Sequence, residues 1–276
     1  MGASGVPANI ITLTTDFGLK DPYVAEMKAV ILSVCPNVII VDVTHEIEKF
    51  NIRMGAYVLA SVAPYFLKGT IHVVVVDPGV GTQRRSLIIQ TRKGFFVGPD
   101  NGVLFLAAEK QGIIHIHEVT NRKLMLAHIS NTFHGRDIFA PAAAHLANGV
   151  LPADFGPEIQ EVVKPEFAKV KFSKGILKGE ILHVDGFGNI ITNIRKEDLE
   201  HLRIEASINV ELANSKMNLK LGKTYAETKP KETIALVGSH GYVEIAVNQG
   251  SAAEEFKAKP GDKILLSSRS CPPPSI

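Results

Sequence analysis

An aspartate and an arginine seven residues apart follow one of the most apolar runs of the chain. Residues 73–76 are four valines, and Asp77 comes directly after them, before a Pro-Gly turn and Arg84. Consecutive β-branched residues are typical of a strand buried on both faces, so Asp77 is expected where such a strand ends. By spacing alone, this pair either braces a turn as an ion pair, the more frequent outcome, or handles a ligand or substrate.

Two further side chains could do chemistry. Asp16 follows the apolar run 11–15, and a carboxylate at the end of a strand can bind a ribose diol or simply cap a loop. His134 lies in the segment FHGRD, before a helix of small apolar residues. Imidazole titrates near neutral pH and can act as a general base, although a single histidine more often has only a structural hydrogen bond.

Other sites are less favoured by the sequence. Asp16, Asp77, His45 and His134 could in principle converge on a metal ion, but the chain has no H-E-x-x-H, no C-x-x-C and no tight ligand spacing, so no metal is expected. The tripeptide D-F-G at 16–18 also occurs in the magnesium loop of kinases, but this chain has neither the Gly-rich loop nor the H-R-D loop of a kinase. Two Gly-rich segments, DGFGN at 185–189 and GSHGY at 238–242, are at least hairpin turns.

The elements that must position these residues alternate between strand and helix. Apolar runs at 11–15, 37–44 and 71–76 are predicted strands, and helical spacing is found at 23–35 and 53–66. Right-handed crossovers make this βαβαβ order a mostly parallel sheet covered by helices. Ligands of such sheets bind beyond the carboxyl ends of the strands, where Asp16 and Asp77 are expected.

The pattern changes in the second half of the chain. After a strand at 86–91 and helices near 103–110 and 137–149, the segment 151–167 carries three prolines and no clear periodicity. We therefore expect an N-terminal α/β domain over 1–165 and a second domain over 166–276. Short alternating runs with Gly turns predict that the second domain is a small antiparallel β-barrel.

Composition limits the classes of partner. The 276 residues are 45% hydrophobic and 21% charged, with 30 basic against 28 acidic residues, which fits a globular protein and predicts neither nucleic-acid nor membrane binding. The N-terminus resembles no export signal. Cys35 and Cys271 lie far apart, so no disulfide framework is expected and the reducing cytoplasm is the predicted location.

Six segments, taken in order, resemble the S-adenosyl-L-methionine hydroxide adenosyltransferases, which are related to the fluorinating and chlorinating enzymes. The segments are TTDFGLKDPYVAEMK, VDPGVGTQRR, VGPDNG, TFHGRDIFAPAAA, DGFGNIITN and GSHGYVEIAVNQGSAAE. The resemblance implies that water displaces methionine from C5′ of S-adenosylmethionine, with no separate cofactor. It also implies a homotrimer with active sites between neighbouring subunits.

The resemblance also implies roles for single residues. Asp77, Arg84 and His134 match the water-handling triad of the family, Asp16 its ribose-diol ligand and Asp21 a group near the methionine ammonium. In the second domain the matches to substrate-contacting positions are Asp185, Phe187, Asn189, Ser239, His240 and Tyr242, of which His240 stands where the halogenating relatives carry arginine.

Charge supports water over halide as the nucleophile. A sulfonium leaves as a neutral thioether and needs no general acid, whereas water needs a base and an oriented position. A halide has no proton to lose and would be repelled by the carboxylate of Asp77. Two other functions remain open from the sequence: a metal-dependent phosphohydrolase that uses Asp16, Asp77 and the histidines, and a binding module in which Asp77 and Arg84 only brace a loop.

Overall fold

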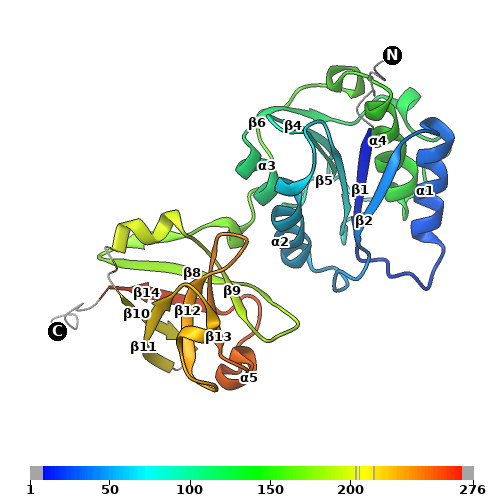
Figure 1. Cartoon of the computed structure of the whole chain (residues 1–276). Helices are drawn as coiled ribbons and strands as arrows, with labels where there is room; N and C mark the ends of the chain where they lie inside the picture. The colour runs from blue at the N-terminus through cyan, green and yellow to red at the C-terminus, as the bar shows by residue number, and fades with distance from the viewer. Residues whose placement is uncertain (1–8, 203, 205, 214, 269–276) are drawn as a thin grey trace, which may run out of the picture. The chain divides into compact units, whose positions relative to one another are not determined.

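The chain divides into two compact units, Met1–Pro165 and Glu166–Ile276. A computed structural model describes residues 9–268 apart from 203, 205 and 214 (Figure 1). The N-terminal leader and the proline-rich tail with Cys271 lie outside the described residues, whereas Cys35 is a buried free thiol. Among the helices described here, none is both long and apolar enough to cross a bilayer.

Unit 1 is a six-stranded sheet with the strand order β2-β1-β3-β5-β4-β6. Parallel pairing joins β2, β1, β3 and β5, while β4 runs antiparallel to both of its neighbours. This confirms the predicted mostly parallel sheet. The elements are β1 (Ile10–Thr15), α1 (Tyr23–Val34), β2 (Ile39–Thr44), α2 (Ile52–Val62), β3 (Ile71–Val75), β4 (Ser86–Thr91), β5 (Phe95–Pro99), α3 (Phe105–Gln111), β6 (Ile113–Glu118) and α4 (Ala140–Ala147).

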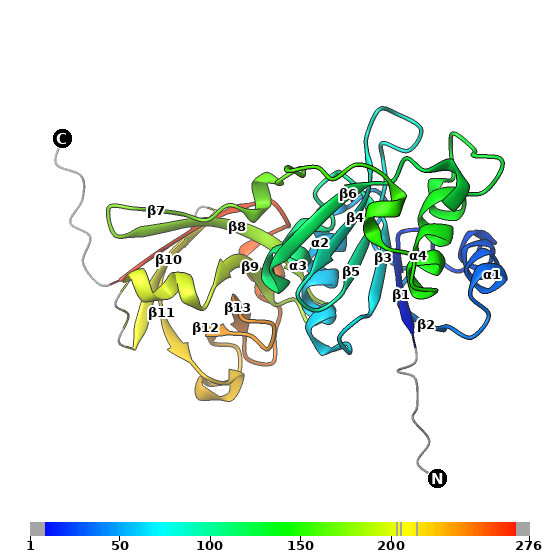
Figure 2. The same cartoon turned by 90° about the horizontal axis from the view of Figure 1, so that it is seen from above.

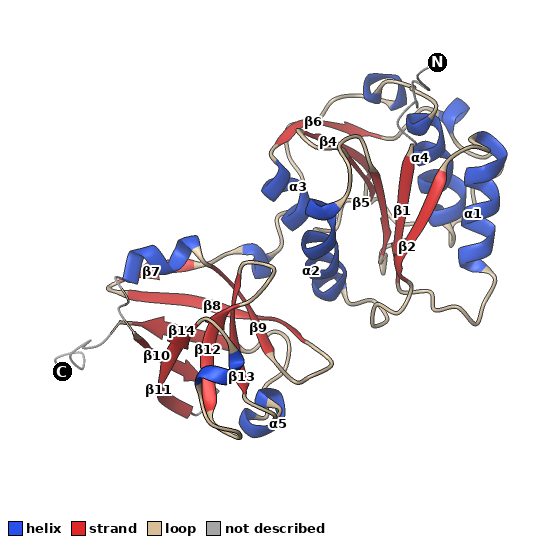
Figure 3. Cartoon of the chain, in the orientation of Figure 1, coloured by secondary structure: helices blue, strands red, loops and turns tan. Residues whose placement is uncertain are grey.

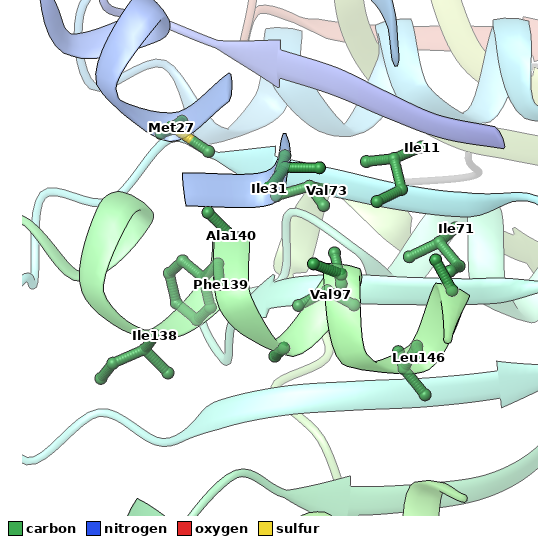
Figure 4. Packing of buried hydrophobic residues seen from close by; sticks show 14 of the residues in the cluster. Ile11, Met27, Ile31, Ile71, Val73, Val97, Ile138, Phe139, Ala140 and Leu146 are labelled. Atoms are coloured by element: carbon green, nitrogen blue, oxygen red, sulfur yellow. The ribbon is translucent and has the colours of Figure 1, made fainter. Parts of the chain in front are cut away.

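Helices cover both faces of this sheet, with α1 and α4 on one side and α2 and α3 on the other (Figure 2). The central strand β3 is therefore buried on both faces, as its unbroken valines predict, and Val73 to Val76 are at most 3% exposed. On the α4 side, Figure 4 shows Ile11 and Val73 of the strands packed with Phe139 and Leu146. Full burial of each such side chain contributes about 1.5–3 kcal/mol.

The predicted helix at 137–149 is divided in the structure. A π-helical turn over Gly135–Phe139 precedes α4, whose first turn contains Pro141. The carboxylate of Asp137, which is fully buried, accepts a hydrogen bond of 2.7 Å from the backbone N–H of Ser130. The turn is thereby fixed directly after His134, and π turns are frequent at functional sites.

Unit 2 is a closed barrel, which confirms the predicted class (Figure 3). Closure comes from β14, which pairs with both β10 and β8, and β7 extends the sheet beyond β8. One expected feature differs, because β11 and β12 pair in parallel while their neighbours are antiparallel. The strands are β7 (Lys171–Ser173), β8 (Ile176–Val184), β9 (Ile190–Arg195), β10 (Ser207–Leu212), β11 (Ser215–Gly222), β12 (Thr233–Val237), β13 (Tyr242–Val247) and β14 (Lys263–Ser267), with one short helix, α5 (Ala252–Phe256).

Candidate active site

Asp77 and Arg84 form a buried, bidentate ion pair at the end of β3. Nε of Arg84 donates to both carboxylate oxygens of Asp77, at 3.0 and 2.9 Å, and Nη2 lies 2.5 Å from Oδ2. The two side chains are only 9% and 5% exposed. Charge-assisted pairs of this geometry fix both groups in direction as well as distance.

The same guanidinium contacts His134, which is fifty residues further along the chain. Nη2 of Arg84 lies 2.7 Å from Nδ1 of His134, and Nη1 donates to Oγ of Ser86 at 2.8 Å. The ring of Phe139 lies under the guanidinium, with Cζ 5.2 Å from its centroid. Arg84 is thus held by four side chains, and the structure brings together the three residues that the resemblance groups as a triad.

Burial and the positive charge of Arg84 lower the pKa of His134 below its ordinary value of 6.5, against the smaller opposing influence of Asp77. Because a guanidinium only donates hydrogen bonds, Nδ1 of His134 must accept. The imidazole is therefore neutral and carries its proton on Nε2, an assignment that follows from the hydrogen-bond pattern. The site contains one carboxylate, one guanidinium and one N–H donor.

A close backbone contact joins the two loops that carry this cluster. Gly81 has a φ of +77°, and a β-carbon at this position would lie 2.2 Å from the carbonyl oxygen of Asn131. Only glycine allows the loop 77–84 to approach the segment before His134 so closely. The sequence shows the glycine, but its partner at Asn131 is visible only in the structure.

Asp16 leaves the sheet beside Asp77. β1 and β3 are parallel neighbours, and their register pairs Thr15 with Val75, so the two aspartates emerge at the same edge. Oδ2 of Asp16 accepts a hydrogen bond of 2.8 Å from the backbone N–H of Phe50, and Asp16 is 6% exposed. Asp21 is exposed on the loop that precedes α1.

Aromatic side chains connect these loops, and sequence reasoning missed them. The ring of Phe133 lies 5.6 Å from that of Phe17 and 5.2 Å from that of Tyr23, edge to face in both cases. Phe17 follows Asp16 and Phe133 precedes His134, so the cluster couples the two segments. Phe50 was also missed; its side chain is 68% exposed beside Asp16, in a left-handed backbone conformation (φ 63°).

In unit 2, the loop between β8 and β9 is organised by Asp185. Its Oδ1 accepts from the backbone N–H groups of Phe187 and Asn189, and its Oδ2 accepts from the side-chain amide of Asn189, all at 2.9 Å. The ring of Phe187 remains 81% exposed. A pocket of about 610 Å³ is lined by Asp185, Phe187, Asn189, Tyr225, Val247, Gln249 and Gly250.

Tyr225 in this lining, and Glu244 behind it, were not predicted as site residues. The hydroxyl of Tyr225 donates to Oε2 of Glu244 at 3.2 Å. Burial raises the pKa of Glu244 above its ordinary value, more than the hydrogen bond from Tyr225 lowers it. A buried carboxyl group behind a lining tyrosine keeps that ring in place, although an isolated glutamate in a strand gives no such signal in the sequence.

The remaining predicted positions lie around the turn between β12 and β13. Ser239 is exposed, His240 is half-buried, and Tyr242, at the start of β13, is 2% exposed. None of the three lines the 610 Å³ pocket of unit 2. In the described part of the chain, no three His, Cys, Asp or Glu side chains are grouped so that they could hold a metal ion.

Comparison with known proteins defines the class. Models of the N- and C-terminal domains of the SAM hydroxide adenosyltransferases match residues 11–156 and 179–265. The chain therefore belongs to the SAM hydroxide adenosyltransferase family, as the six segments predict.

Similar proteins extend over nearly the whole chain. An (R)-S-adenosyl-L-methionine hydrolase of Salinispora tropica is 39% identical over 94% of this chain and 98% of its own. One from Methanocaldococcus jannaschii is 37% identical over 94% and 95%. A fluorinase of Actinoplanes sp. is 30% identical over 96% and 99%. A solved structure of an uncharacterized conserved protein from Thermotoga maritima has a TM-score of 0.85 and 37% identity, over 93% of this chain and 99% of that one.

Proposed function

We propose that this chain is an enzyme that hydrolyses S-adenosyl-L-methionine to adenosine and L-methionine. The observation that carries the proposal is the contact of Arg84 with both Asp77 and His134, within a family of adenosyltransferases that use hydroxide. A water oxygen forms a bond to C5′ while the C5′–S bond breaks. The electron pair of the C5′–S bond stays on sulfur. The sulfonium charge disappears and one proton is released.

Asp77 is the group that accepts this proton. In a neutral His134, the lone pair on Nδ1 is already used by Arg84, and Nε2 carries a hydrogen. Oδ1 of Asp77 accepts one hydrogen bond from Arg84 and retains a further lone pair, whereas Oδ2 already accepts two. Arg84 orients the carboxylate and stabilises the developing hydroxide, and the N–H of His134 is a donor for the water oxygen.

The substrate is bound by the other residues of the family match. Asp16 binds the ribose diol and Asp21 the methionine ammonium, while Asp185, Phe187 and Asn189 contact the amino acid and the adenine. Ser239 binds the methionine carboxylate, with His240 and Tyr242 as further contacts. The enzyme acts in the cytoplasm as a homotrimer with active sites between neighbouring subunits, without a metal or other cofactor.

Product analysis tests this function. The purified protein is incubated with S-adenosylmethionine, with and without chelator and halide, and the products are separated by chromatography. Equal amounts of adenosine and methionine, unchanged by chelator and without halogenated adenosine, are expected. Asp77→Ala and His134→Ala are expected to abolish most turnover, and Asp16→Ala to raise KM. Normal turnover in both triad variants would refute the assignment of water activation.

The two alternative functions give different results in the same assay. A metal-dependent phosphohydrolase would lose activity with chelator. A binding module would bind S-adenosylmethionine tightly without turnover, and Asp77 and Arg84 would then be a structural pair only.

A further inference from the structure

A buried histidine without a role in the proposed chemistry lies behind Asp16. His45 is 4% exposed, and its Nδ1 lies 2.9 Å from Oγ1 of Thr15, the last residue of β1. On its other side, Nε2 lies 3.1 Å from Oδ1 of Asp42 in β2, within ion-pair distance although not aligned for a hydrogen bond. The imidazole thus bridges the ends of two neighbouring strands.

The donor and the acceptor of each of these contacts can be assigned. Burial would raise the pKa of Asp42, but the hydrogen bond from Lys28 and the nearby imidazole of His45 outweigh it and lower the pKa, so Asp42 is an acceptor-only carboxylate. This places the proton of His45 on Nε2, and Nδ1 accepts from the hydroxyl of Thr15. Oγ1 of Thr15 in turn accepts from the backbone N–H of Phe17 at 3.2 Å.

The backbone of the same two segments is joined around Asp16. The N–H of Gly18 donates to the carbonyl of His45 at 2.7 Å, and the N–H of Ile47 donates to the carbonyl of Thr15 at 3.3 Å. Phe50, in the segment that follows His45, donates to the Asp16 carboxylate itself. Residues on both sides of Asp16 are therefore held by the segment that begins at His45.

We propose that His45 is a positioning residue for substrate binding: through Thr15 and its own backbone it fixes the loop that presents the Asp16 carboxylate to the ribose. This inference rests on the proposed function of Asp16. It predicts that loss of the imidazole weakens binding of the nucleoside part of the substrate and leaves the chemical step nearly unchanged.

A second buried histidine, His72 in β3, also bonds a threonine of β1 and provides a matched control. His72 is 1% exposed, and its Nδ1 lies 2.8 Å from Oγ1 of Thr12, so it too bonds a buried β1 threonine. Thr12 lies inside the strand, however, where it pairs with His72 and Val41 rather than with the loop at Asp16. Replacement of either histidine removes one buried imidazole–threonine hydrogen bond. Only the bond of His45 lies beside the loop that carries Asp16.

The experiment compares His45→Leu, His45→Asn, Thr15→Val, His72→Leu and Asp16→Ala in the full-length enzyme. KM, kcat and the inhibition constants of adenosine and methionine are measured for each. For His45→Leu and Thr15→Val, KM and the inhibition constant of adenosine are expected to rise roughly tenfold. The turnover number kcat and the inhibition constant of methionine should stay within about twofold of wild type. Asparagine places an amide near the position of Nδ1, so His45→Asn should restore most of the affinity. His72→Leu should lower the stability of the protein without changing KM or the inhibition constant of adenosine.

Each outcome decides between the inference and the function on which it rests. If Asp16→Ala weakens adenosine binding while both His45→Leu and Thr15→Val bind it normally, the positioning role is wrong and the proposed function stands. If Asp16→Ala itself binds adenosine normally, the ribose assignment is wrong. If His45→Leu does not fold, the comparison of Thr15→Val with His72→Leu decides: equal adenosine constants overturn the inference.

Discussion

Nη2 of Arg84 lies 2.7 Å from Nδ1 of His134, so a residue after β3 and a residue before α4 are joined by one guanidinium. Since Arg84 is also bidentate to Asp77, its planar fork fixes the distance and orientation between the carboxylate and the imidazole.

Arg84→Lys is expected to lower kcat by about 10²–10³-fold with a small change in KM, because an ammonium group cannot span Asp77 and His134 at once. Steady-state kinetics measure the effect. Arg85→Lys is the control: Arg85 pairs with Asp100 at 2.8 and 2.5 Å, away from His134, and its replacement should leave kcat nearly unchanged. Equal losses in the two variants would contradict a specific role for Arg84.

Activity should persist at pH values where an ordinary histidine is already protonated. Burial and Arg84 lower the pKa of His134, so the neutral imidazole that accepts from Arg84 is retained as the pH falls through 6.5. The acid limb of the kcat/KM profile is therefore expected below pH 6.5. His134→Asn, whose amide oxygen can still accept from Arg84, should have lower activity and lack this limb. A limb centred at or above pH 6.5 in the wild type would contradict the assignment.

Gly81→Ala is expected to reduce turnover strongly, because its β-carbon would overlap the carbonyl of Asn131 and displace the loop that carries Arg84. Gly69→Ala separates this effect from backbone strain. Gly69 also has a positive φ, of +93°, but no atom lies within 4 Å of the position that a β-carbon would occupy there. Both variants should lose about 1–2 kcal/mol of stability from the left-handed backbone, and only Gly81→Ala should lose activity. Denaturation and kinetics on both variants check this.

Acid should destabilise unit 1 through His72. Burial lowers the pKa of His72 from 6.5 to about 4. Between pH 6.5 and pH 4, the imidazole is therefore protonated in the unfolded chain and neutral in the folded one. The free energy of unfolding is therefore fully retained above pH 6.5 and falls by about 3 kcal/mol as the pH drops to about 4. Urea denaturation at several pH values measures this slope. In His72→Leu the slope should become shallower; an unchanged slope would assign the acid sensitivity to other groups.

The sequence predicts the layers of unit 1 because periodicity is local. The four valines before Asp77 are enough to infer a strand buried on both faces, and its end locates the carboxylate. The choice between a bracing pair and a reactive site is not local. It depends on His134, which contacts Arg84 from a loop whose backbone also lies against Gly81 at Asn131, fifty residues further along the chain.

Three features of the structure could not be predicted from sequence patterns. The π turn before α4 depends on the hydrogen bond from Ser130 to Asp137, and helical spacing alone predicts a continuous helix there. The parallel pairing of β11 with β12 depends on how the chain crosses the barrel, since alternation of apolar residues is the same for both strand directions. The aromatic cluster of Phe17, Tyr23 and Phe133 is likewise assembled from separate segments.

Closure of the barrel by β14 has a consequence for synthesis on the ribosome. β14 pairs with β8 and β10, so the sheet of unit 2 cannot close until residue 267 has been translated. The six strands of the sheet of unit 1 and its helices α1 to α4 are complete by Ala147. Since domains fold as units during translation, the N-terminal one first, the nascent chain should protect the Asp77–Arg84–His134 cluster from protease while the barrel is still open.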